Sequence, residues 1–182
     1  MKRIVPILFS ALALAACALA QAPTDPIEKA LMAAPAQLRE GASVIKWKAD
    51  YTYDTLKTGT NTLVCYDKSG MPGVQPFMVE CTGKGNLPRA AQNIKIEALG
   101  DKAKSQAAFD AAEKDGSRVK PEFGSVWYHA MGPDAMHLRM HMTIAVPGAT
   151  TASIGLPDNN KSGGVWIMNA GTSTAHLMTP GE

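Results

Sequence analysis

Two segments of this chain alternate between apolar and polar residues, and this alternation constrains the fold more than any other feature. Between residues 136 and 146, methionine and aliphatic side chains occupy every second position, with mostly histidine, arginine and threonine between them. Residues 43–53 alternate in the same way, with lysine and aspartate on the polar face. A period of two is typical of a half-buried antiparallel strand. We therefore expect a sheet with an apolar and a polar face.

The remaining patterns predict further strands and a central helical part. Shorter strand-like segments are expected at residues 60–66, 77–82, 124–131, 165–168 and 175–178. Helices are expected where an aspartate can cap a helical segment, from Asp25 to about Ala34 and, within residues 87–115, from Asp101 onwards. This order favours an α+β fold, with a mainly antiparallel sheet and two or three helices packed on one side.

The N-terminus has the layout of a bacterial export signal. Lys2 and Arg3 precede an apolar run, which is followed by small residues that suit a cleavage site. The run is shorter than the roughly 20 residues that a membrane span requires, and we expect no transmembrane span in the mature chain. We assign residues 1–20 to a signal peptide, 21–40 to a leader and short helix, and 41–182 to a single α+β domain.

Two cleavage sites are possible, and they imply different mature proteins. Ala18-Leu19-Ala20 before Gln21 fits an A-x-A signal peptidase site, which would release a periplasmic or secreted protein. The preceding Leu-Ala-Ala-Cys17 looks like a lipobox, in which Cys17 would carry a lipid and anchor the chain as an outer-membrane lipoprotein. The sequence leaves both alternatives open.

The charge of the chain argues against nucleic-acid binding. Lys2 and Arg3 account for the formal net charge of +2, so the chain without its signal is balanced. No block of basic residues and no alternation of basic and aromatic residues follows. Because affinity for phosphate backbones depends on concentrated positive charge, we do not expect a nucleic-acid partner.

Two cysteines, Cys65 and Cys81, remain after the signal, each in an expected strand. An even number of cysteines in an exported protein indicates a disulfide. The alternative, a pair of metal-binding thiolates, is weaker because the spacing is not Cys-x-x-Cys and no histidine lies nearby in sequence. We therefore predict a Cys65–Cys81 bridge.

The segment that contains His137 and His141 between methionines suggests a copper site. Thioether and imidazole groups are both ligands that copper accepts. On a strand that rises about 3.3 Å per residue, however, the two histidines would stand about 13 Å apart, too far for one ion. The methionines would then fill the core, and a metal site would require His129 or His176 from another strand.

A group of hydroxyl residues precedes His176 and suggests a hydrolase. Ser173 is the candidate nucleophile, with His176 as its base. The sequence lacks the Gly-x-Ser-x-Gly elbow of the α/β hydrolases. The same residues would also suit a polar turn whose hydroxyls bond to the backbone.

At Gly59–Cys65, Pro76–Cys81 and Trp166–Met178, this sequence resembles a family of exported bacterial proteins of unknown function. Its members carry Gly-Thr-Asn-Gly-Trp-Thr-Cys, a second cysteine soon after, and a C-terminal Ala-Gly-Thr-Pro-Tyr-Ala-His-Leu-Met. Here Thr62-Leu63 stands in place of Gly-Trp, and Ser173-Thr174 in place of Pro-Tyr. The resemblance implies a Cys65–Cys81 bridge and draws attention to His176, but it implies no activity or cofactor.

The function that the sequence favours is a non-catalytic module of the periplasm or envelope that binds a small ligand or an envelope protein. This expectation follows from the export signal and from the lack of phosphate-loop, dinucleotide or zinc-protease motifs. The alternatives are a copper-binding protein that uses His129, His137, His141 or His176, and a hydrolase that uses His176.

Overall fold

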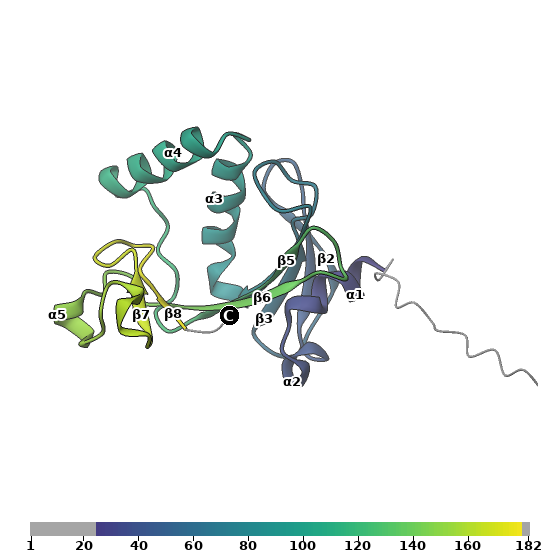
Figure 1. The fold of residues 1–182 in the computed structure, drawn as a ribbon. Helices are drawn as coiled ribbons and strands as arrows, with labels where there is room; N and C mark the ends of the chain where they lie inside the picture. Colours follow the sequence, from purple (N-terminus) through teal and green to yellow (C-terminus); the bar gives the residue numbers. More distant parts are fainter. Residues whose placement is uncertain (1–24, 180–182) are drawn as a thin grey trace, which may run out of the picture.

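An eight-stranded sheet forms the centre of the computed structural model, which describes residues 25–179 (Figure 1). The strands follow the order β2-β1-β3-β4-β5-β6-β8-β7. Their bounds are β1 (Ser43–Trp47), β2 (Tyr53–Lys57), β3 (Leu63–Asp67), β4 (Phe77–Gly83), β5 (Val126–Gly132), β6 (Arg139–Ala145), β7 (Trp166–Met168) and β8 (His176–Met178). β1 and β3 pair in parallel, and the other neighbours are antiparallel. The predicted α+β fold with a mainly antiparallel sheet is therefore confirmed.

The signal peptide expected at residues 1–20, with the alternative lipid site Cys17, lies outside the described residues. Within residues 25–179, no helix has both the length and the apolar character needed to cross a membrane. The helices are α1 (Pro26–Ala30), η1 (Leu31–Ala33), α2 (Ala36–Arg39), η2 (Lys84–Asn86), α3 (Leu87–Glu97), α4 (Lys102–Asp115), α5 (Thr151–Ile154) and η3 (Asn160–Ser162).

The predicted helix ends are set by local hydrogen bonds. The Asp25 carboxylate accepts from the Ile27 amide at the start of α1, and Asp101 accepts from the Lys104 amide at the start of α4. These aspartates satisfy amides that have no partner inside the helix. α4 ends at Gly116, whose φ of 78° is the left-handed conformation that glycine adopts at low cost.

Helices cover both faces of the sheet (Figure 1). Because adjacent strand residues face opposite ways, Val44 belongs to the core beneath α1 and η1, whereas Ile45 belongs to the core beneath α3. α4 packs on α3 rather than on the sheet. A smaller core around Ile167 lies at the β7–β8 end.

The predicted disulfide is present. Cys65 in β3 lies directly opposite Cys81 in β4, and their sulfurs are 2.08 Å apart. Both cysteines are fully buried, on the sheet face that α1 and η1 cover. The bridge therefore joins two neighbouring central strands.

The expected single strand at residues 43–53 is wrong, because the chain reverses within it. β1 ends at Trp47, and Tyr51 takes a left-handed conformation with φ 66°. Asp50 fixes this turn by accepting hydrogen bonds from the amide and the hydroxyl of Thr52. Alternation continues through the turn, so periodicity alone does not reveal the reversal.

The strand expected at residues 136–146 begins only at Arg139, because a turn precedes it. Asp134 accepts from the amides of Met136 and His137, which makes a turn of the segment before β6. The prediction that the methionines fill the core is wrong for Met136 and Met140, which are 62% and 51% exposed. The main contacts of α1 and η1 are with β3, β4 and β5.

Candidate functional site

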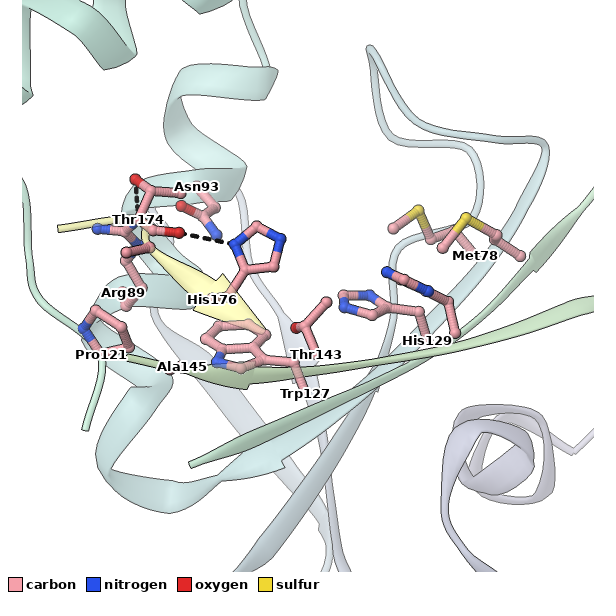
Figure 2. A pocket seen from close by; sticks show the side chains of 13 residues that line it. Met78, Arg89, Asn93, Pro121, Trp127, His129, Thr143, Ala145, Thr174 and His176 are labelled. Carbon is pink, nitrogen blue, oxygen red and sulfur yellow. Dashed lines mark hydrogen bonds between the residues drawn. The ribbon is translucent and has the colours of Figure 1, made fainter. Parts of the chain in front are cut away.

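A cavity of about 280 Å³ lies on the α3 face of the sheet, over β4, β5, β6 and β8 (Figure 2). Its apolar wall includes Trp127, Met78 and Met131. Its polar lining residues are Arg89, Asn93, His129, His141, Thr143, Thr174 and His176. Three of the four predicted histidines therefore meet in one cavity, although they come from three different strands.

The floor of the cavity continues a row of polar side chains that runs across four strands. The strand register places Tyr66 opposite Glu80, Glu80 opposite His129, and His129 opposite His141. Directly opposed residues share a face of the sheet and lie close enough for their side chains to interact. Glu80 could not be singled out from the sequence, because this row exists only once the register is set.

Glu80 is a buried carboxylate, with Tyr66, Lys68 and His129 arranged around it. The Tyr66 hydroxyl donates to it at 2.9 Å, the Lys68 ammonium at 3.2 Å, and Nδ1 of His129 lies 3.3 Å from Oε1. Burial acts to raise the pKa of Glu80, but Lys68, His129 and Tyr66 outweigh it. The pKa lies far below its ordinary value, so Glu80 is ionised.

Lys68 joins this carboxylate to α3. Its ammonium lies 2.7 Å from Oε2 of Glu97, and its side chain is only 3% exposed. Burial acts to lower the pKa of Lys68, but the two carboxylates raise it above its ordinary value. The ionised group of Lys68, Glu80 and Glu97 therefore carries one net negative charge directly beside His129.

His129 is oriented by this charge. Its Nδ1 is buried and has no well-aligned hydrogen bond, so the 3.3 Å distance to Glu80 is a close contact without hydrogen-bond geometry. We assign the proton of the neutral ring to Nδ1, because the Glu80 carboxylate lies 3.3 Å from this nitrogen. Nε2 is then the basic ring atom left for the cavity. The ring of His141 stacks on it, with centroids 5.8 Å apart.

His176 is the second oriented imidazole of the cavity. Its Nδ1 donates to the Thr174 carbonyl at 2.7 Å. Burial lowers its pKa, despite the opposing effect of this hydrogen bond, so the ring is neutral at neutral pH. In Figure 2, His176 from β8 and His129 from β5 point into the same space, with Thr143 between them.

Arg89 supplies a permanent positive charge from α3. Its side chain donates to the Val119 carbonyl, to Ser173 Oγ at 3.3 Å and to Thr174 Oγ1 at 2.8 Å. Burial, followed by repulsion from Arg118, lowers its pKa to about 10, which still leaves it charged at neutral pH. The guanidinium thus holds the turn before β8 against α3.

The hydrolase hypothesis requires a hydrogen bond between Ser173 and His176, but Ser173 has other partners. Its hydroxyl donates to Glu113 Oε2 at 2.5 Å, and its amide donates to Oε1 of the same carboxylate. Nδ1 of His176 is directed to Thr174 instead. The two predicted catalytic residues are therefore not hydrogen-bonded to each other, and Ser173 serves as a link between the C-terminal turn and α4.

His137 does not join the other histidines. It is an exposed residue of the turn before β6, where Nδ1 lies 2.8 Å from Asp134. Within residues 25–179, no group of three or more histidine, cysteine, aspartate or glutamate side chains has the geometry to hold a metal ion.

The chain matches no protein-family model, no curated protein and no solved structure.

Proposed function

We propose that this protein is a small-molecule binding module of the bacterial envelope, and that its ligand is a small organic anion held in the histidine-lined cavity. The observation that carries the proposal is the charge of the lining. Arg89 contributes a positive charge, and the amide of Asn93 and the hydroxyls of Thr143 and Thr174 contribute donors, while none of the described lining residues is an aspartate or glutamate. Such a lining favours an anion over a cation.

The volume of the cavity and its apolar wall indicate a small ligand with a hydrocarbon part. The cavity volume of about 280 Å³ lies at the lower end of the range for small-molecule sites. Trp127 and the two methionines offer a contact surface for a hydrocarbon part. A small carboxylate with a few carbon atoms fits these properties better than a peptide or a large cofactor.

Location in the envelope is the second part of the proposal. Its support is the export signal in the sequence and the Cys65–Cys81 disulfide, a bond typical of oxidising compartments. Mass spectrometry of the mature N-terminus distinguishes release after Ala20 from a lipid on Cys17.

Isothermal titration calorimetry with malonate, succinate and benzoate tests the binding site. We expect at least one of them to bind with a Kd below about 1 mM, equivalent to about −4 kcal/mol. The decisive variant is His176→Asn, whose amide can still donate to the Thr174 carbonyl while the imidazole ring that lines the cavity is lost. We expect it to weaken binding about tenfold, or by about 1.4 kcal/mol.

The matched control is His137→Asn, which removes a histidine outside the cavity. It should bind the same anion as tightly as the unaltered protein. The binding proposal fails if none of the three anions shows saturable binding, or if both variants bind with unchanged affinity.

A further inference from the structure

We propose that His129, backed by Glu80, is a general base that removes a proton from a small carbonyl compound bound in this cavity. The inference rests on the proposed binding site and goes beyond it, because it assigns chemistry to the bound ligand. The substrate class is a small organic anion with an acidic C–H next to a carbonyl group.

The first support is the fixed orientation of the imidazole. Glu80 is ionised and buried, and it is itself held by Tyr66 and Lys68. Nδ1 of His129 lies 3.3 Å from this carboxylate and is shielded from solvent, while the ring lines the cavity. A base that is oriented by a third group is a recurrent arrangement at sites of base catalysis.

The second support is the charge around the base. When His129 accepts a proton it becomes a cation beside the group of Lys68, Glu80 and Glu97, which carries one net negative charge. The resulting cluster is neutral overall, so the new positive charge is balanced by its neighbours. An isolated imidazole in the same buried place would lack this compensation.

The opposite side of the cavity can stabilise the product of proton removal. Arg89 and Thr174 lie there, Thr143 lies between His176 and His129, and all three carry donors. Donors that are already in place stabilise negative charge as it develops on an oxygen. His176 is held neutral by burial, so it places no second positive charge near the imidazolium that forms at His129.

The step is balanced without a further reactant. The C–H bond breaks, and its proton moves to Nε2 of His129. The electron pair of that bond forms a C=C bond, and the carbonyl electrons move onto the oxygen to give an enolate. Return of the proton to the same or a neighbouring carbon completes an exchange or an isomerisation, with no net oxidation.

The chain contains its own control for this inference. His137 and Asp134 form another histidine–carboxylate contact, at 2.8 Å, but both side chains are more than half exposed. This pair has similar chemistry without a cavity. Any activity that comes only from a surface imidazole would therefore depend on His137 as much as on His129.

Two proton-abstraction probes test the inference. The first is 5-nitrobenzisoxazole, from which a base removes the C3 proton while the N–O bond breaks to give a coloured phenolate. The second is pyruvate in deuterium oxide, whose methyl protons are lost by exchange through the enolate and followed by NMR. Neither reaction needs a cofactor.

The decisive variant is His129→Asn, whose amide can still face Glu80 while the basic nitrogen is lost. We expect the rate with at least one probe to fall by tenfold or more, towards the range of about 10²–10⁴ that a positioned base contributes. Glu80→Gln should lower the same rate, and His137→Asn should leave it unchanged. Circular dichroism confirms that each variant is folded, and if Glu80→Gln does not fold, His129→Asn decides alone.

Equal rates for the unaltered protein and His129→Asn with both probes overturn the inference. The calorimetric titrations separate this failure from failure of the binding site. Anion binding without His129-dependent turnover refutes the base alone, whereas absence of both refutes the binding proposal as well.

Discussion

Replacement of Lys68 by methionine should destabilise the protein strongly at neutral pH and much less in acid. Lys68 is the positive partner of Glu80 and of Glu97, and its side chain is 3% exposed. Methionine keeps a long apolar stem but removes the charge. Glu80 would then remain as a buried carboxylate whose nearest compensating cation is gone.

The magnitude follows from the burial of this group. Removal of one partner from a buried ion pair costs about 3–5 kcal/mol, because the other charge is left uncompensated. For a chain of this size, about 1 kcal/mol corresponds to a shift in Tm of about 2–4 °C. We therefore expect Tm to fall by at least about 6 °C at neutral pH.

The loss of stability in Lys68→Met should depend on pH, and the direction of this dependence follows from the ionisation of Glu80. In the unaltered protein the pKa of Glu80 is depressed, so this residue contributes stability above its unfolded pKa of about 4.3 and loses it as the pH falls below that value. In Lys68→Met, the charge that opposed the effect of burial is gone, so burial raises the pKa of Glu80. Protonation of Glu80 then removes the cost of a buried, uncompensated carboxylate. The difference between the two proteins should therefore shrink as the pH falls from about 7 to about 4.

Urea unfolding at both pH values, with linear extrapolation to water, measures this difference. Lys48→Met is the matched control, because Lys48 pairs with Asp54 at the surface, where both side chains are largely exposed. Such a pair contributes about 1 kcal/mol or less. A loss below about 1 kcal/mol for Lys68→Met at neutral pH, or a loss that does not change with pH, would refute this reasoning.

Two further predictions concern the framework of the fold. Replacement of both Cys65 and Cys81 by alanine should lower the free energy of unfolding by about 3 kcal/mol, the value for a closed loop of this length, and chemical denaturation checks it. An unchanged denaturation midpoint would show that the bridge does not stabilise the sheet. Asp101→Ala should cost about 1 kcal/mol, because the Lys104 amide loses its cap. Asp110→Ala, an exposed change within the same helix, is its control, and equal effects of the two would contradict the capping role.

Much of the framework could be predicted because it depends on local interactions. Asp25 and Asp101 cap helices through amides two and three residues ahead, so their roles can be read from short segments. The disulfide could be predicted from the expected compartment and the number of cysteines. The turn at Tyr51 was missed because Asp50 and Thr52 reverse the chain without interrupting the alternation.

The site could be predicted only in part, because its geometry depends on pairing between strands. His129 and His141 become neighbours through the register of β5 and β6, which begins after the turn at Asp134. The same turn removes His137 from the group. Glu80 carries no motif of its own, and its role depends on Lys68 and on His129, which lies more than 40 positions away in sequence.

The protonation of the neutral His129 ring tests the central claim most directly. Nitrogen NMR distinguishes a ring protonated on Nδ1 from one protonated on Nε2. We predict that His129 carries its proton on Nδ1, towards Glu80, and that Glu80→Gln weakens this preference. A proton found on Nε2, with no response to Glu80→Gln, would contradict the account.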